Sequence, residues 1–179
     1  MKGSLILAVT ICLRFGLAAE NTDSATIHDF ENRVASYVHL RGSVESNLAP
    51  LGATSSQEKI SVEQHNLADA LRQARKNAAE GDIFAPPVAA EFRRLIGMAL
   101  RSDGKRIRAS LRHAEPVQLQ LHVNDIWPSN VPLQSTPPGL LANLPRLPRQ
   151  MEYRVTRHDL VLLDAKADLV VDLIENAIQ

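Results

Sequence analysis

The spacing between apolar residues changes once along this sequence, at Val117, and the change constrains the fold more than any other feature. From position 26 to position 99 the apolar residues recur every three or four positions, which gives a helix one apolar face. From Val117 to Val123 they alternate with polar residues, as in a strand with one buried face. The sequence therefore predicts an α+β fold, in which about four N-terminal helices pack on a small, roughly three-stranded antiparallel sheet.

Helix start and stop signals divide the first half into four segments. The first helix runs over 26–48, and a capping box of Ser55 and Glu58 begins the second, which ends at Gly81 and Asp82. We expect these two helices to pair as an antiparallel hairpin. Tandem prolines at 86–87 begin a third helix, and a turn at 103–104 separates it from a short helix over 105–113.

The second half is expected to build the sheet. Six prolines between Trp127 and Pro148 exclude a central strand and predict an extended crossing over a sheet edge, with one helical turn over 139–143. Segments 153–156 and 160–163 indicate a hairpin whose second strand is covered on both faces. Asp164 can then cap a C-terminal helix, which we expect, while the valines at 170–171 favour a competing strand over 169–174.

Residues 1–18 have the pattern of a secretory signal peptide. Lys2 precedes an apolar run over 5–13, and small residues at 16 and 18 favour cleavage after Ala18. The run is shorter than the roughly 20 residues that cross a bilayer, so no membrane span is expected after cleavage. We therefore predict export to the periplasm or the medium, with residues 19–179 as a single domain that has a helical half (24–113) and a strand-containing half (116–179).

Cleavage also limits the chemistry of the mature chain. The one cysteine, Cys12, lies in the signal, so disulfides, thiolate metal sites and thiol nucleophiles are excluded afterwards. The full chain has 20 basic and 20 acidic residues, and losing Lys2 and Arg14 leaves a net charge of −2. This balance gives no overall attraction to nucleic acid, and none is expected as a partner.

A series of short motifs from Val123 onward resembles that of a group of exported bacterial proteins with no assigned activity. The motifs are VND at 123–125, WP at 127–128, PL at 132–133, TPPGLLANLPRLP at 136–148, MEYR at 151–154, DLVLLD at 159–164 and DLVVDLI at 168–174. The likeness covers about half of the mature chain and is weaker over EFRRLI at 91–96. It implies export and a shared fold, and it carries no catalytic residues across.

The densest local charge is a basic run in which Asp103 is the only acid. Its members are Arg93, Arg94, Arg101, Lys105, Arg106, Arg108 and Arg112. We take Arg101, Lys105, Arg106 and Arg108 as candidate binding residues for an anionic ligand or an acidic protein surface. Helical spacing argues against full convergence, and pairing with acids of neighbouring helices is the alternative. The run has no interleaved aromatics on which single-stranded nucleic acid would stack.

No spacing in the sequence predicts a cofactor, a metal site or a catalytic residue. The six histidines lack zinc-binding spacings such as HxxxH, and the GxSxG motif of serine hydrolases does not occur. The sequence therefore favours a non-enzymatic binding or assembly protein of the cell envelope or medium. The alternative is a small hydrolase acting on envelope or extracellular polymers, with its site at the His158–Asp159 pair or at the row of Asp164, Asp168 and Asp172.

Overall fold

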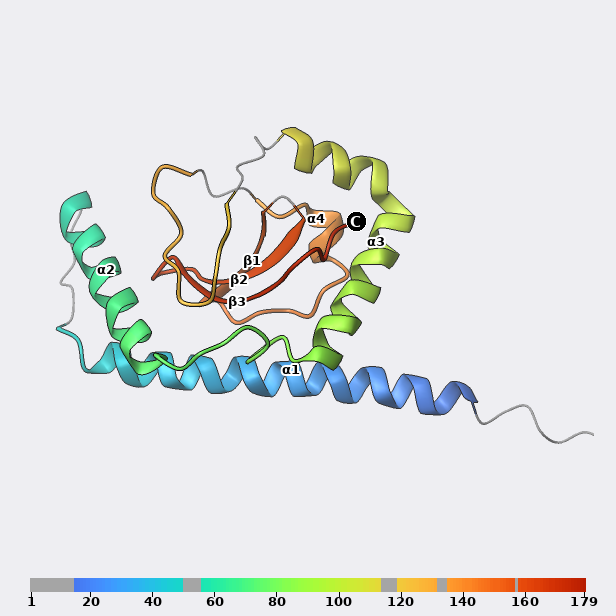
Figure 1. Ribbon diagram of the computed structural model, residues 1–179, viewed down its shortest axis with the longest axis horizontal. Helices are drawn as coiled ribbons and strands as arrows, with labels where there is room; N and C mark the ends of the chain where they lie inside the picture. Colours follow the sequence, from blue (N-terminus) through green and yellow to red (C-terminus); the bar gives the residue numbers. More distant parts are fainter. Residues whose placement is uncertain (1–14, 50–55, 114–118, 132–134, 157) are drawn as a thin grey trace, which may run out of the picture.

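A computed structural model of the chain describes residues 15–49, 56–113, 119–131, 135–156 and 158–179. These residues form an α+β structure in which helices surround a three-stranded antiparallel sheet, as predicted (Figure 1). Most of the predicted signal peptide lies outside the described residues. No helix in the described ranges is long and apolar enough to cross a membrane.

The sheet consists of β1 (Met151–Thr156), β2 (Asp159–Asp164) and β3 (Leu169–Ile174), hydrogen-bonded in that order. β1 and β2 form the predicted hairpin, with Met151 opposite Asp164 and Thr156 opposite Asp159. β2 is the central strand, and residues 160–163 are fully buried. The prediction that this apolar run is covered on both faces is therefore confirmed.

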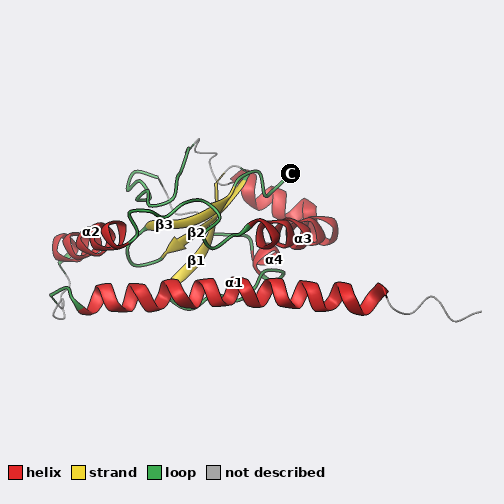
Figure 2. Ribbon diagram, turned by 60° about the horizontal axis from the view of Figure 1, so that its bottom comes forward, coloured by secondary structure: helices red, strands yellow, loops and turns green. Residues whose placement is uncertain are grey.

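Alternate residues of β2 face two different layers. Leu160 and Leu162 belong to the main core, which lies between the sheet, α1 (Phe15–Ser46) and α3 (Pro86–His113). Val161 and Leu163 belong to a second cluster, which Trp127 and neighbouring residues of segment 119–131 cover. The sheet is thus a middle layer with helices on one face and an irregular segment on the other (Figure 2).

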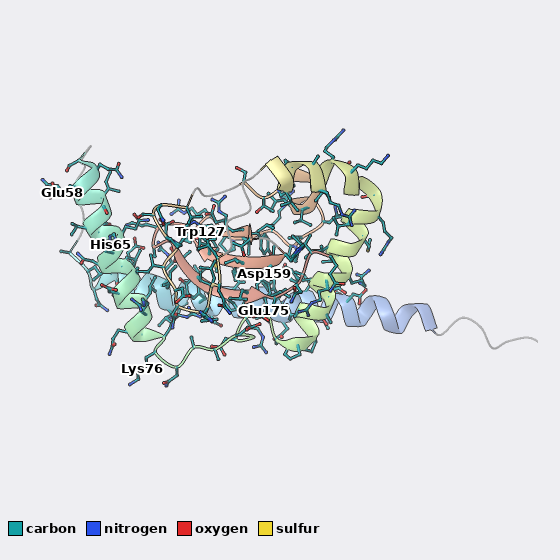
Figure 3. All side chains as sticks on the ribbon, turned by 45° about the horizontal axis from the view of Figure 1, so that its top comes forward. Glu58, His65, Lys76, Trp127, Asp159 and Glu175 are labelled. Atoms are coloured by element: carbon teal, nitrogen blue, oxygen red, sulfur yellow. The ribbon has the colours of Figure 1, made fainter. Side chains whose placement is uncertain are left out.

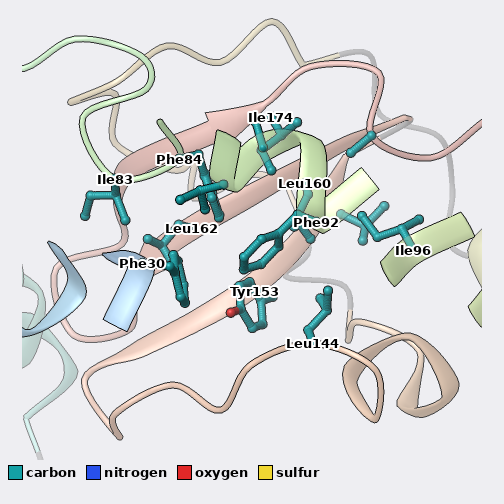
Figure 4. Packing of buried hydrophobic residues seen from close by; sticks show 14 of the residues in the cluster. Phe30, Ile83, Phe84, Phe92, Ile96, Leu144, Tyr153, Leu160, Leu162 and Ile174 are labelled. Carbon is teal, nitrogen blue, oxygen red and sulfur yellow. The ribbon is translucent and has the colours of Figure 1, made fainter. Parts of the chain in front are cut away.

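Aromatic rings fill the centre of the main core. Phe30 of α1, Phe84 of the loop before α3 and Phe92 of α3 pack with ring centroids 4.8–5.7 Å apart, and Tyr153 of β1 lies 6.0 Å from Phe92 (Figure 4). Such stacked, tilted and edge-on pairs add about 0.5–1.5 kcal/mol each beyond the apolar area that they bury. These four aromatic rings therefore join α1 and α3 to the sheet.

The second helix differs from its prediction at both ends. α2 (Gln57–Ala74) is capped by Ser56, whose side chain accepts the Lys59 N–H, and not by Ser55, which lies outside the described residues. It ends at Ala74, because Arg75 leaves the helical conformation and turns its side chain into the protein. Residues 75–85 form a loop in place of the predicted last helical turns.

α2 contacts the rest of the fold through its C-terminal half. Leu67 and Leu71 pack with Val44 and Leu48 at the end of α1, whereas the first turns of α2 rise away steeply (Figure 1). α2 stands at a steep angle to α1 and meets it only near its C-terminal end (Figure 1), so the antiparallel hairpin that the sequence predicts is wrong.

The third and fourth predicted helices are one helix with a bend. α3 is interrupted at Asp103, whose φ of −134° is not helical, at the turn that the sequence predicts. The expected helical turn in the proline-rich crossing is α4 (Pro138–Leu141). The described residues thus contain three helices before the proline-rich crossing, and the bend in α3 accounts for the fourth predicted one.

The strand predicted over 117–123 is wrong for its described part. Residues 119–123 form no ladder, and the pairing begins only afterwards, where Asn124 N–H donates to Val170 O and Ile126 forms an isolated bridge with Leu169. The alternation nevertheless reflects a segment with one buried side, since Leu119 and Leu121 pack on the outer face of the sheet. A two-residue period requires one buried side but no hydrogen-bonded neighbour.

The prediction of a C-terminal helix is also wrong, because residues 169–174 form the competing strand, β3. Every residue of β3 is buried, and neighbouring residues face opposite layers: Val170 lies in the outer cluster and Val171 in the main core. A helix would place both valines within 100° on one side, whereas a covered strand uses both faces. Asp164 does cap, but it caps the turn to β3 by accepting the Lys166 and Ala167 N–H groups.

Candidate functional site

Exposed basic side chains surround the bend of α3. We call Arg101, Lys105, Arg106 and Arg108 the basic elbow. The inner side of the bend packs on α4, where a Cβ added to Gly139 would lie 3.3 Å from Asp103 Oδ2 and 3.5 Å from Ile107 Cγ1. Ile107 is buried, and the four basic residues of the elbow are exposed. The bend therefore turns its positive charges to solvent.

The charges of the elbow have weak partners or none. Arg106 is 86% exposed, with its Nη1 3.8 Å from Asp103 Oδ2, and Arg108 Nη2 donates to the Gln179 backbone oxygen at 3.2 Å. Arg101 and Lys105 make neither an ion pair nor a hydrogen bond with a residue that the structure describes. The elbow is therefore a local excess of positive charge in a chain whose acidic and basic residues balance.

The other two described members of the basic run, Arg93 and Arg94, are exposed but have partners within the chain. Arg94 forms a two-pronged pair with Glu91 at 2.6 and 2.7 Å and also meets Asp23 at 3.1 Å. Arg93 donates to the Glu175 backbone oxygen at 3.1 Å. The alternative of pairing with acids thus holds for Arg94, while the side chain of Arg112 lies outside the described part of the chain.

A buried carboxylate at the end of β2 joins α1 to the sheet. Asp164 Oδ2 accepts the Tyr37 hydroxyl at 2.8 Å and Arg41 Nε at 2.7 Å, while Oδ1 accepts the Lys166 and Ala167 N–H groups. Burial raises the pKa of Tyr37, with the Asp164 charge adding to the effect, so its hydroxyl keeps the proton that it donates.

The same network extends to α2 through charged side chains. Arg41 Nη1 reaches Glu45 at 2.6 Å, and Lys166 Nζ reaches both Glu45 at 2.8 Å and Glu63 at 2.6 Å. The hydrogen bonds from Lys166 and Arg41 lower the pKa of Glu45. This chain of ion pairs links α1, α2 and the β2–β3 turn, and no local spacing in the sequence predicts it.

A second buried carboxylate, Asp172 of β3, is bound by the loop between α2 and α3. Its Oδ2 accepts the Ile83 and Phe84 N–H groups, both at 2.8 Å, and its Oδ1 accepts the Gly81 N–H at 3.0 Å and the Leu173 N–H at 2.8 Å. The φ of +88° at Gly81 suits glycine and turns the loop around the carboxylate. Asp172 is therefore fully satisfied by backbone donors.

The acidic row does not form one face. Asp164 and Asp172 are each enclosed by the partners described above, and Asp168 lies in the turn between β2 and β3 with a φ of +46° and a hydrogen bond from Gln64 of α2. Burial raises the pKa of Asp168. Because each carboxylate has its own partners, the row that helical spacing predicts is not assembled.

His158 and Asp159 both hold the C-terminal residues. The backbone oxygen of His158 accepts the Ile178 N–H at 2.8 Å, and its Nδ1 lies 2.9 Å from Ile178 O, which fixes Nδ1 as the protonated nitrogen. Asp159 Oδ1 accepts the Asn176 N–H at 2.8 Å. No described serine donates a hydrogen bond to His158, so the pair has the partners of a structural turn.

The described histidines are scattered. Figure 3 shows His65 on α2, at one end of the molecule and away from Asp159 and Glu175. His122 lies 3.3 Å from Asp125, three residues along the same segment. Within the described residues, no group of three or more histidine, cysteine or acidic side chains is placed to hold a metal ion.

Comparisons with protein-family models, with curated proteins and with solved structures found no match for this chain. The likeness to exported bacterial proteins therefore stays a prediction.

Proposed function

We propose that this protein is an exported, non-enzymatic binding or assembly protein whose basic elbow docks on an anionic partner. The observation that carries the proposal is that four exposed basic side chains gather within residues 101–108, at the bend of α3. Arg41, Arg94 and Arg154 are each held by a carboxylate, whereas Arg101 and Lys105 face solvent without one in the described part of the chain. Arg101 and Lys105 are therefore available to a partner without the loss of a contact to a described residue.

The surroundings of the buried acids support binding over catalysis. The carboxylates of Asp164 and Asp172 accept four hydrogen bonds each, which leaves neither free to transfer a proton or to attack a substrate. Docking through the elbow would be electrostatic, and it would weaken as salt rises, because exposed charges are screened within about 8–10 Å at physiological ionic strength.

Charge reversal tests the elbow. We expect the variant with Arg101→Glu, Lys105→Glu, Arg106→Glu and Arg108→Glu to bind immobilised polyglutamate at least about tenfold more weakly at low salt, since each cation near an anionic surface contributes about 1 kcal/mol. Surface plasmon resonance at several salt concentrations measures the loss.

A matched control variant separates the effect of the elbow residues from the effect of the changed net charge. Lys59, Lys76, Arg146 and Arg149 are exposed and make no ion pair among the described residues. Reversing these four changes the net charge equally and should leave binding within about twofold of wild type. Equal losses in the two variants would mean that the elbow has no special role.

Export is supported by the pattern of residues 1–18. We expect protein recovered from outside the cytoplasm to begin at Ala19, because the small residues at 16 and 18 fit a cleavage site. N-terminal sequencing after cell fractionation measures this. An intact chain that begins at Met1 and is confined to the cytoplasm would contradict export.

A further inference from the structure

A small cavity that is open to solvent lies between α1 and the loop that follows α2. Its volume is about 270 Å³, several times the roughly 30 Å³ that one water occupies in the liquid, so a phosphate or carboxylate group fits. Arg33, Ser36 and Tyr37 line it from α1, and Arg75 and Asp82 line it from the loop side. The basic elbow contributes no residue to this cavity.

Arg75 is a buried cation with only neutral partners in direct contact. Its side chain belongs to a residue that is 9% exposed; Nη1 donates to Asn124 Oδ1 at 3.0 Å and Nη2 to Val171 O at 2.9 Å. The guanidinium lies 5.1 Å from the ring centroid of Tyr37. No described carboxylate comes within ion-pair distance of it, and its Nε has no hydrogen bond to a described residue.

Arg41 provides the internal comparison. It is buried to a similar degree, yet it contacts the carboxylates of both Asp164 and Glu45. Buried charges in proteins are ordinarily paired in this way, because an unpaired charge away from water is costly. Burial lowers the pKa of Arg75, as expected for a guanidinium short of counter-charge. The cavity beside Arg75 is where a counter-ion would be accommodated.

Arg33 supplies a second guanidinium at the cavity. Its Nε donates to Asp29 at 2.8 Å and its Nη1 to the Asp82 backbone oxygen at 2.9 Å, which fixes the group and leaves Nη2 without a described partner. Two guanidinium groups offer planar, charge-assisted donors that suit the oxygens of phosphate and carboxylate.

The acids near the cavity are engaged. Asp29 pairs with Arg33, Asp82 Oδ2 accepts the Ala79 N–H at 3.0 Å, and Asp172 is enclosed by backbone donors of the loop. These acids partly offset the positive charge of the two arginines. The ligand is therefore held more by the remaining N–H donors than by net charge, and we expect its affinity to be modest.

We propose that this cavity binds a small oxyanion group, phosphate or carboxylate, through the free donors of Arg33 and Arg75. The site stands independently of the basic elbow. The ligand is a small molecule or ion that carries such an oxyanion group, either free phosphate or a carboxylate-bearing compound.

Thermal unfolding with phosphate or acetate tests the proposal. At constant ionic strength set with sodium chloride, we expect 50 mM of at least one of these anions to raise Tm by about 2–4 °C in a saturable way. A response to both indicates general oxyanion binding, and a response to one identifies the group. No rise beyond the chloride reference would overturn the site.

Two variants locate the response. Arg33→Gln removes the outer guanidinium, and Ser36→Glu places a carboxylate at the cavity while keeping the exposed helical position; both should abolish the rise in Tm. Ser43→Glu is the matched control, since Ser43 is an exposed serine of the same helix with the same hydrogen bond to the residue four positions earlier. A rise that persists in Arg33→Gln and Ser36→Glu refutes the site. The elbow variant should keep the response, which separates this test from the test of the proposed function.

Discussion

Asp172→Ala should be the most destabilising single substitution that the described contacts identify, with a loss of at least about 3 kcal/mol of unfolding free energy. The carboxylate is fully buried, and its removal leaves the N–H groups of Gly81, Ile83 and Phe84 without an acceptor. Each buried donor left unpaired costs about 1–3 kcal/mol. Urea unfolding followed by circular dichroism measures the loss.

Two further variants make this expectation specific. Asp172→Asn keeps the shape and one acceptor oxygen, so its loss should be about half as large, and it remains measurable if the alanine variant does not fold. Asp159→Ala is the control, because Asp159 accepts one backbone N–H at a partly exposed position. A loss for Asp172→Ala no greater than that for Asp159→Ala would show that the loop does not depend on Asp172.

Arg41→Met should have the second largest effect, about 3 kcal/mol. It removes the cation that contacts Asp164, and a buried charge that loses its partner costs about 3–5 kcal/mol. The double variant Arg41→Met, Asp164→Asn should lose at least about 1 kcal/mol less than the sum of the single variants. Additive losses in the urea unfolding of the four proteins would refute this coupling.

The pH dependence of stability reports the outer part of the same network. The folded-state pKa of Glu45 is lowered by Lys166 and Arg41, so its contribution is present above the ordinary glutamate pKa of about 4.3 and is lost as pH falls through the lowered value. Wild type should therefore lose more stability than Glu45→Gln on acidification below about pH 4.5. Parallel curves for the two proteins would contradict the pairing.

Much of the fold follows from local pattern, because each such feature depends on neighbours in sequence. The bend at Asp103 needs only a turn signal before Gly104, and the β1–β2 hairpin needs two apolar runs on either side of a polar pair. The helical turn at α4 follows proline placement in the same way. The exposure of the basic elbow also follows, since its residues lie off the apolar stripe of α3.

The tertiary structure decided how the remaining segments were used. Residues 119–123 alternate like a strand but cover the sheet from outside, and 169–174 permit a helix until burial on both faces selects β3. Alternation reports burial, whereas strand pairing depends on which backbone lies alongside, and no local pattern encodes that.

The sequence alone determined the elements whose causes are local: the apolar faces of the helices, the hairpin, the bend and the basic residues on its outer side. Only the tertiary structure decided the partners of the buried charges. Asp172 within an apolar run signals a buried carboxylate, but three of its four donors lie about ninety residues earlier. Two of the four donors to Asp164 lie more than one hundred and twenty residues earlier. Long-range pairing of this kind depends on the packing of the whole chain. A buried charge requires hydrogen-bond partners, and only the tertiary structure determines which donors lie next to it.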